Sequence, residues 1–219
     1  MKNIILIAAP SAGKGTEAKI LNEEFSIPHI STGDLLRDAT KKNDDTAKMI
    51  NELISNGKFV SDEIVLNLLK DRLSMDDCLN GYILDGFPRN VEQAKAYDKI
   101  LMELNKDIGL VIVMDIDKEI AKSRVVGRYI CPKCGKIYNI NNELKPKNGM
   151  LCDDCNIDLI HRSDDTAETY EERYKTYVEK TQPLIEYYSD KGVLYHVNAG
   201  INMEETHNQI KKIIGDQND

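Results

Sequence analysis

The sequence has no tryptophan, only seven arginines and no long run of apolar residues. A helix that spans a membrane needs about 18 or more apolar residues in a row, and no segment of this 219-residue chain reaches that length. The N-terminal stretch "MKNIILIAAPSAGKG" has one early lysine and a short apolar run, which favours a buried first strand over an export signal. We therefore expect a cytoplasmic protein with no membrane partner.

An excess of positive charge is also missing. The formal net charge is −8, which argues against a general nucleic-acid binder. With 41% hydrophobic and 30% charged residues, the chain is long enough for one α/β domain with a small insertion. Because arginine is scarce and suits bidentate phosphate recognition, the position of each one is informative. The seven are Arg37, Arg72, Arg89, Arg124, Arg128, Arg162 and Arg173.

Short apolar runs alternate with helical patterns along the chain. The runs at 2–7, 110–116 and 193–199 predict buried strands, and 81–90 predicts a buried strand that ends in an acidic, Gly-containing turn. A short strand and a capped helix are expected over 27–39. Residues 128–163 are turn-rich. Helical spacing predicts helices over 13–25, 44–56, 61–73, 91–104, 117–129, 166–192 and 202–214. This alternation predicts a parallel sheet covered by helices.

The first strand leads into "AAPSAGKGT", residues 8–16. A strand, a loop of small residues, Gly-Lys and a helix together form an anion site, because backbone N–H groups point at the ligand and Lys14 adds a charge. Ala8 and Ser11 carry a Cβ, which has a steric cost wherever the loop needs positive φ. The alternative is an ordinary strand-to-helix turn.

Other features could also bind phosphate. Asp85 ends a predicted strand, where its carboxylate could lie near a phosphate-bound Mg²⁺, and Arg89 follows; the alternative is a plain Asp-Gly turn. Thr32 and Gly33 open a helix with Arg37 one turn later, which could bind a second anion or be a capped surface helix. The remaining candidates, or else surface charges, are Arg124, Arg128, Arg162 and Arg173.

Four of the five cysteines form two CxxC pairs with 17 residues between them. Cys131, Cys134, Cys152 and Cys155 match the spacing of a tetrahedral zinc site. Four thiolates close the coordination shell, so we expect a structural ion. The alternative of two redox dithiols lacks a thioredoxin-like setting. Cys78 stands alone.

Taken together, "APSAGKGT", "ISTGDLLR", "LDGFPRN", "RVVGRYIC", the CxxC pairs and "HRSDD" resemble adenylate kinase in its long bacterial form with a zinc-bearing lid. The resemblance covers nearly the whole chain. It implies an α/β fold, a doubly wound parallel sheet of the P-loop nucleoside monophosphate kinase type, with a helical NMP-binding insertion and a small β-rich zinc lid. The implied division is a core of 1–30, 61–126 and 165–219, an NMP-binding insertion of 31–60 and a lid of 127–164.

The resemblance also implies a role for individual residues. ATP would be bound by Ser11, Ala12, Gly13, Lys14, Gly15, Thr16, Arg128, Ile137, Tyr138 and Ile201, the last through its backbone. AMP would be bound by Thr32, Gly33, Arg37, Lys58, Phe59, Val60, Gly86, Phe87, Pro88, Arg89, Gln93, Arg162 and Arg173. The catalytic positive charges would be Lys14, Arg89, Arg128, Arg162 and Arg173, with Mg²⁺ reached by Asp85 through water.

The expected function is reversible in-line transfer of a phosphoryl group from MgATP to AMP, giving two ADP, by a monomer that closes its lid over the substrates. Two departures affect this expectation. Ala8 and Ser11 replace loop glycines, and Tyr129 stands where a second lid arginine is often found. The alternatives are a kinase for another nucleoside monophosphate, or a catalytically impaired nucleotide-binding protein.

Overall fold

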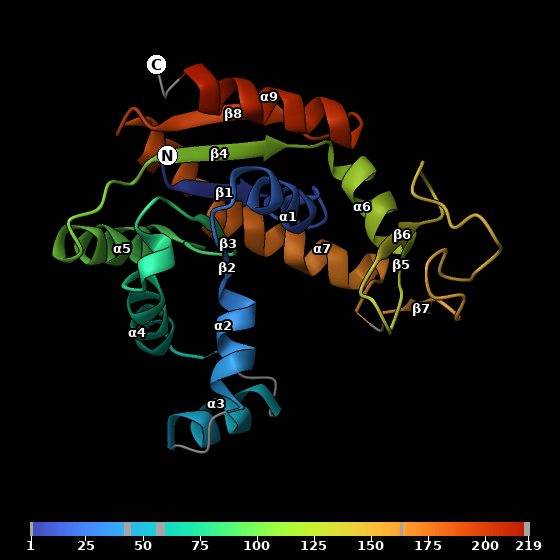
Figure 1. The fold of residues 1–219 in the computed structure, drawn as a ribbon, viewed down its shortest axis with the longest axis horizontal. Coiled ribbons are helices and arrows are strands. Elements are labelled where there is room, and N and C mark those ends of the chain that lie inside the picture. Colours follow the sequence, from blue (N-terminus) through green and yellow to red (C-terminus); the bar gives the residue numbers. More distant parts are fainter. Residues whose placement is uncertain (1, 42–44, 56–59, 163, 217–219) are drawn as a thin grey trace.

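The computed structural model describes residues 2–41, 45–55, 60–162 and 164–216 (Figure 1). Its centre is a five-stranded sheet in the order β2-β3-β1-β4-β8, in which every pair of neighbours is parallel. The strands are β1 (Ile4–Ala8), β2 (His29–Ser31), β3 (Ile83–Asp85), β4 (Leu110–Asp115) and β8 (Leu194–Asn198). The chain leaves the central β1 toward one edge and later crosses to the other, which is the doubly wound pattern that the sequence predicts.

Side chains alternate between the two faces of this sheet, so each face has its own core. Ile5, Ile7 and Val113 lie on one face, with α4 (Asp62–Leu73), α5 (Val91–Glu103) and α8 (Pro183–Ser189) packed against it. Ile4, Leu6 and Ile112 lie on the other face, beneath α1 (Lys14–Phe25) and α9 (Met203–Asp216). The inner strands β1 and β4 are buried on both faces, which explains why they read as continuous apolar runs.

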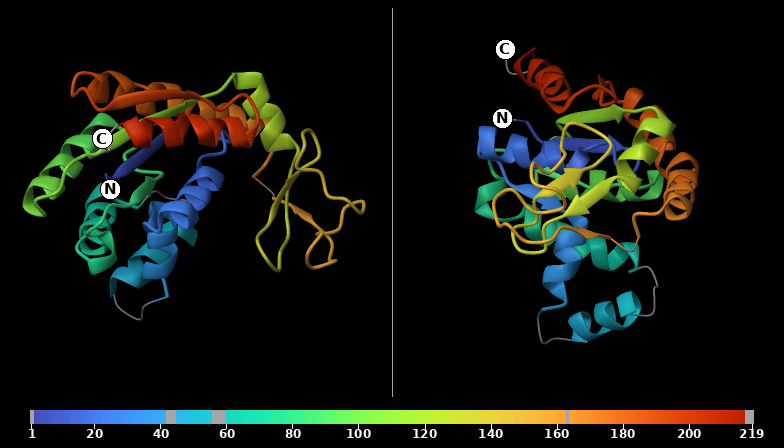
Figure 2. Two further views of the ribbon diagram at one scale, coloured as in Figure 1. Left: turned by 45° about the horizontal axis from the view of Figure 1, so that its top comes forward. Right: turned by 90° about the vertical axis from the view of Figure 1, so that its right-hand side faces the viewer.

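Two parts of the chain project from this core (Figures 1 and 2). One consists of α2 (Thr32–Ala39) and α3 (Asp45–Ser55), which follow β2. The other follows α6 (Lys118–Val126) and holds a small antiparallel sheet in the order β6-β5-β7. Its strands are β5 (Arg128–Ile130), β6 (Ile137–Asn139) and β7 (Ile160–His161). The two projections stand apart in both figures.

Two helix predictions need correction. The helix predicted over 117–129 ends at Val126, and β5 begins at Arg128. At Gly127 a Cβ would lie 2.6 Å from side-chain atoms of Asn139 and Asn141, so the chain needs glycine where it enters the small sheet. By contrast, the strand predicted within 81–90 ends at Asp85 as expected, and the residues after it form a turn that begins at Gly86 with a φ of 81°.

The helix predicted over 166–192 is also interrupted. It consists of α7 (Ala167–Thr176), a π-helix (Tyr177–Thr181) and α8. Pro183 has no N–H to donate, so it suits the first turn of a new helix and not a helix interior. Elsewhere, a 3₁₀ helix (Asp76–Cys78) lies between α4 and β3.

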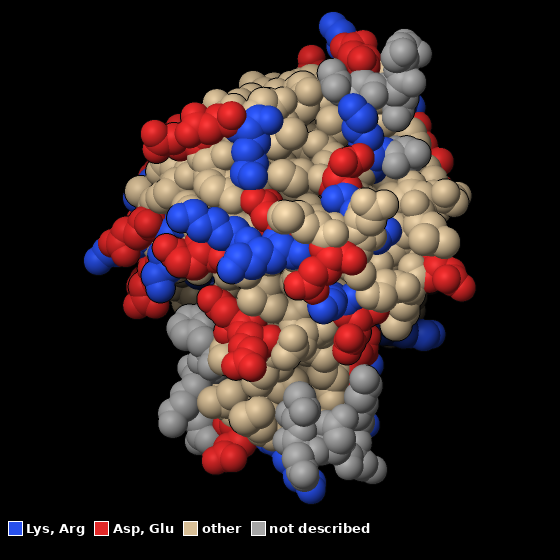
Figure 3. Space-filling model, turned by 90° about the vertical axis from the view of Figure 1, so that its left-hand side faces the viewer, with Lys and Arg blue, Asp and Glu red and all other residues tan. Residues whose placement is uncertain are grey.

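Acidic and basic side chains are interspersed on the face that carries α4 and α5 (Figure 3). The ion pair between Lys70 of α4 and Glu103 of α5, 2.5 Å long, is one example. No single sign of charge dominates this face. None of the helices in the described ranges has the length and apolar character needed to cross a bilayer.

Candidate functional site

The loop between β1 and α1 turns sharply at two residues with positive φ. Gly13, the N-cap of α1, has a φ of 97°, and Ser11 has a φ of 62°. Glycine adopts such angles at no steric cost, whereas serine does not. The backbone N–H groups of Thr16 and Glu17 both donate to the Gly13 carbonyl at 3.0 Å, which starts the helix. The helix N-terminus therefore opens next to the loop, where it favours an anion.

Asp85 lies at the end of β3, beside this loop. Its carboxylate is 3.2 Å from Lys14 Nζ and 3.3 Å from His29 Nε2. Burial raises the pKa of Asp85, but the hydrogen bond with His29 and the charge of Lys14 outweigh it and hold that pKa below its ordinary value. Asp85 is therefore an ionised carboxylate at the carboxyl end of the sheet, where ligands bind in doubly wound folds.

A cavity of about 130 Å³ lies behind the loop. Seven of the residues that were predicted to bind ATP line it, namely Ser11, Ala12, Gly13, Thr16, Arg128, Ile137 and Ile201. Lys14, Gly15 and Tyr138 are not among its lining residues. Apart from Arg124, the sequence did not predict the other lining residues, which include Glu17, Met114, Asn139, Ala199, Met203 and Thr206. These residues carry no local motif and meet only through the fold.

Arg124 forms one wall of this cavity. Its guanidinium donates to the carbonyls of Ala199 (2.8 Å) and Ile201 (3.1 Å), which fixes the loop between β8 and α9 against α6. Burial lowers the pKa of Arg124, and Glu143 partly opposes this. The scarcity of arginine in the sequence singled out Arg124 as a candidate, but the sequence did not predict the backbone carbonyls that it contacts.

Three more arginines meet two consecutive aspartates. Arg128 forms a double hydrogen bond with the buried Asp165, one arm of which is 2.7 Å from Nε to Oδ2. Arg162 and Arg173 share Asp164, at 3.0 and 2.6 Å. Burial raises the pKa of Asp164, but hydrogen bonds from Arg173 and Arg162 hold it below its ordinary value. The fold thus gathers arginines from β5, from the segment after β7 and from α7.

On the other side of Asp85, a hydrogen-bonded group surrounds the loop after β3. The Gly86 carbonyl accepts from Thr32 Oγ1 (3.2 Å) and from Arg89 Nε (2.8 Å). The Arg89 N–H donates to Gln93 Oε1 (2.7 Å), and Gln93 Nε2 donates to Asp62 (2.6 Å). These contacts join four of the residues that were predicted to bind AMP.

The other predicted AMP residues lie elsewhere. Arg37 pairs with Asp34 on the exposed side of α2, and Gly33 lies beside it. Phe87 and Pro88 are buried in the loop after β3. Val60 precedes α4 and is half-buried. Lys58 and Phe59 fall outside the described residues.

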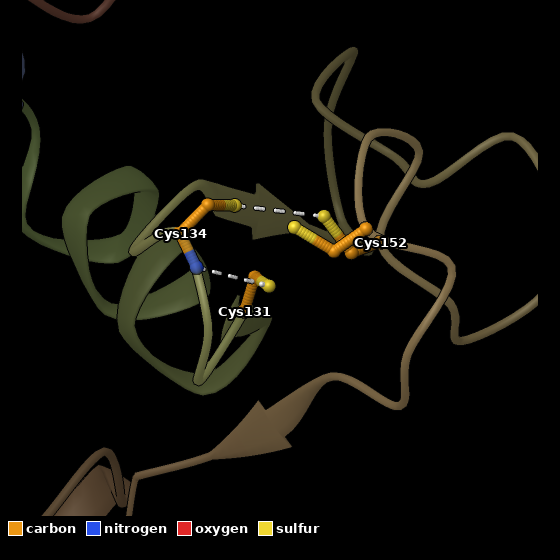
Figure 4. Close-up of side chains that lie close together, drawn as sticks. Cys131, Cys134 and Cys152 are labelled. Atoms are coloured by element: carbon orange, nitrogen blue, oxygen red, sulfur yellow. Dashed lines mark hydrogen bonds between the residues drawn. The ribbon is translucent and has the colours of Figure 1, made fainter.

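The four paired cysteines come together in the small projection. Their sulfur atoms all lie within 4.8 Å of one another, and Cys134 Sγ is 3.7 Å from Cys152 Sγ (Figure 4). A tetrahedral ion with Zn–S bonds of about 2.3 Å requires sulfur atoms about 3.8 Å apart. The four thiols therefore fit a tetrahedral metal ion.

The two CxxC turns have matching backbones. Gly135 N–H donates to the Cys131 carbonyl, and Asn156 N–H donates to the Cys152 carbonyl. Gly135 and Asn156, each directly after the second cysteine, have φ values of 73° and 51°. Glycine and asparagine are the residues that best tolerate this region.

Thiol ionisation in this cluster depends on its neighbours. The Tyr138 hydroxyl donates to Cys152 Sγ (3.4 Å), and this hydrogen bond is the main cause that lowers the pKa of Cys152 to about 6. Hydrogen bonding to Cys134, with burial, raises the pKa of Cys155 to about 12. Several thiolates this close repel one another, so a cation is needed to ionise all four. Tyr138 is buried and faces the cysteines, which explains why it does not line the cavity.

Comparisons with known proteins agree over nearly the whole chain. Residues 6–193 match the family model described as adenylate kinase. An adenylate kinase of Thermotoga neapolitana is 46% identical over 216 residues, covering 98% of each chain. An adenylate kinase of Kosmotoga olearia is 46% identical, covering 96% of this chain and 97% of the relative. One from Clostridium botulinum is 43% identical, covering 97% and 98%.

Proposed function

The chain belongs to the adenylate kinase family. We propose that it transfers a phosphoryl group reversibly from MgATP to AMP, giving two ADP, and we assign a role in this reaction to individual residues. The observation that carries the assignment is the cavity behind the loop between β1 and α1. It opens at a helix N-terminus and is bordered by arginines. Such a site suits a nucleoside triphosphate, because the charged phosphates can lie at the helix N-terminus while the base lies in the cavity.

ATP binds in this cavity, with its phosphates on the loop formed by Ser11 to Thr16. Backbone N–H groups and Lys14 hold the phosphates, and Lys14 exchanges its contact with Asp85 for them. Ile201 contacts the adenine through its backbone, on a segment that Arg124 holds in place. Ile137 and Arg128 complete the cavity from the small projection.

AMP binds on the opposite side of Asp85. Thr32, Gly86, Arg89 and Gln93 form a connected group there, and Arg89 supplies a planar cation for the AMP phosphate. The remaining AMP contacts are proposed for Gly33, Arg37, Lys58, Phe59, Val60, Phe87, Pro88, Arg162 and Arg173.

The transfer step needs alignment, neutralised charge and exclusion of water, and no covalent intermediate. Lys14, Arg89, Arg128, Arg162 and Arg173 supply the protein's positive charge. Asp85 would hold Mg²⁺ through water, and the ion would supply positive charge next to the phosphates. Closure of the small projection over ATP and of 31–60 over AMP excludes water that would otherwise accept the phosphoryl group.

We assign the four cysteines to a structural zinc ion that stiffens the lid, residues 127–164. This lid and the insertion 31–60 are carried by a core of 1–30, 61–126 and 165–219. A closed shell of four thiolates leaves no position for substrate, so the ion stabilises the lid and takes no part in transfer. We propose that the enzyme is a cytoplasmic monomer.

The test is a coupled assay of ADP formation with MgATP and each of AMP, GMP, UMP and CMP. We expect AMP to be the preferred acceptor. Lys14→Met, which keeps the stem and removes the charge, should reduce turnover at least ~100-fold, in line with the loss of one preorganised charge contact. Preference for another monophosphate would identify a different kinase. Absence of turnover with all four would indicate a binding protein impaired by Ala8 and Ser11.

A further inference from the structure

Arg89 is held by its backbone on both sides. Its N–H donates to Gln93 Oε1, a residue of the neighbouring α5. Its carbonyl accepts a hydrogen bond of 2.9 Å from Thr181 Oγ1, which lies 92 residues further along the chain. The second contact is the unusual one, because it ties the loop after β3 to a distant helical segment.

Thr181 reaches this carbonyl from the end of the π-helix. The Gln182 N–H donates to the Tyr177 carbonyl at 2.9 Å, which is a bond across five residues and not four. Each residue of an α-helix turns the chain by about 100°, so the extra residue of a π-turn changes which face the following side chains occupy. A regular α-helix from α7 onward would carry Thr181 away from Arg89.

The same helical segment carries another arginine of the proposed site. Arg173 lies on α7, and α7 leads directly into the π-helix. Beyond it, α8 and the turn that follows it contact α5. The Tyr187 hydroxyl of α8 donates to Asp98 at 2.6 Å, and Lys191, two residues after α8, donates to the same carboxylate at 2.8 Å. The segment from α7 to α8 therefore contacts α5 and also the loop that leads into it.

We propose that Thr181 is a positioning residue for phosphoryl transfer. Its hydroxyl fixes the Arg89 carbonyl and so holds the Arg89 guanidinium in place relative to Arg173, which lies on the same helical segment as Thr181. The π-helix is the feature that turns Thr181 toward the loop. This inference rests on the proposed role of Arg89 in binding the AMP phosphate.

The decisive variant is Thr181→Val, which removes the hydroxyl and keeps the branched shape of the side chain. Thr176→Val is the matched control, because the Thr176 hydroxyl donates to the Glu172 carbonyl of its own helix, at 3.0 Å, and not to the loop after β3. Thr181→Ser keeps the hydroxyl and should rescue the effect. Steady-state rates would be measured against AMP and, separately, against ATP, with melting temperatures for each variant.

We expect Thr181→Val to lower kcat/KM for AMP about three- to tenfold, the range expected for the loss of one neutral hydrogen bond. The KM for ATP should stay within about twofold of the parent, and Thr181→Ser should recover most of the loss. Thr176→Val should match the parent toward AMP. The inference is overturned if Thr181→Val behaves like Thr176→Val, or if it raises the KM values for ATP and AMP equally.

Arg89→Lys separates this inference from the proposed function. If Arg89→Lys is strongly impaired while Thr181→Val is normal, the role of Thr181 is refuted and the assignment of Arg89 stands. If Arg89→Lys turns over AMP normally, the assignment of Arg89 fails, and the inference fails with it. In the double variant Arg89→Lys/Thr181→Val, adding Thr181→Val should lower kcat/KM for AMP much less than it does in the parent, because the effects of residues that act through one another are not additive. Full additivity of the two changes would refute the coupling.

Discussion

Replacing Ser11 by glycine should stabilise the protein, because Ser11 holds a left-handed backbone with a φ of 62°. An L-residue in this region costs about 1–2 kcal/mol. Glycine removes that cost but adds about 0.4–1 kcal/mol of backbone entropy to the unfolded chain. The net gain is then about 0.5–1 kcal/mol, which corresponds to a rise in melting temperature of roughly 1–4 °C for a chain of this size.

The same substitution should tighten ATP binding. Ser11 lines the cavity, so its hydroxymethyl group limits how closely the loop backbone approaches a phosphate. We expect the Kd for ATP to fall by up to about threefold, a change of about 0.6 kcal/mol. Titration calorimetry with ATP and a thermal unfolding scan of the free protein measure the two effects separately.

Ser26→Gly is the matched control. Ser26 has a φ of 53° at the C-cap of α1, at the far end of a 12-residue helix from the loop. It should raise the melting temperature by a similar amount and leave the Kd for ATP unchanged. A lower melting temperature for Ser11→Gly, together with a rise for Ser26→Gly, would show that the Ser11 side chain makes a stabilising contact that outweighs its backbone strain.

Three further predictions concern other parts of the site. Arg89→Lys keeps the charge but loses the planar fork, so turnover with AMP should fall well over tenfold with little change in melting temperature; a large loss of stability with intact specific activity would indicate a structural ion pair. Cys155→Ser should lower zinc content and melting temperature more than activity at a permissive temperature, because the ion supports the lid and not the chemistry; a variant of full stability without catalysis would contradict this. The pKa of Asp85 is depressed in the folded state, so its stabilising contribution is present above its ordinary value of 3.8 and is lost as the pH falls through the lower folded value. In acid unfolding followed by circular dichroism, Asp85→Asn should therefore show a weaker pH dependence than the parent in that window, and an unchanged dependence would refute the assignment.

The sequence predicted the inner strands β1 and β4 well because burial on both faces leaves a strong apolar signal. β4 is a run of five buried residues followed by the exposed Asp115, and "LVIVMDI" reflects that directly. The ends of elements were harder to predict. The helix after β4 ends at Val126, and the next residue must be glycine because a Cβ at Gly127 would collide with the side chains of Asn139 and Asn141. Contacts made by residues more than ten positions away leave no periodic pattern in the helix itself.

The cysteine cluster and the cavity differ in how far a local sequence pattern defines them. Each CxxC turn builds half of the thiol cluster from five consecutive residues, including the Gly135 or Asn156 that closes it, so spacing alone predicts most of the geometry. The cavity draws on β4, α6, β6 and α9, and most of its wall carries no local motif. The same limit hid Thr181, whose hydroxyl matters only because a π-turn brings it to Arg89.

The arginine partners in this structure indicate which side chains can move to a nucleotide. Arg162 and Arg173 are both more than two-fifths exposed, and they share one carboxylate of Asp164. Exposed ion pairs of this kind contribute little to stability, so an arriving phosphate can replace Asp164 at small cost. Arg128 differs, because its partner Asp165 is fully buried. Leaving a buried carboxylate without its partner is strongly unfavourable. Arg128 should therefore approach ATP while still bonded to Asp165, moving together with the proposed lid. Arg162 and Arg173, by contrast, should exchange a protein carboxylate for the transferring phosphate.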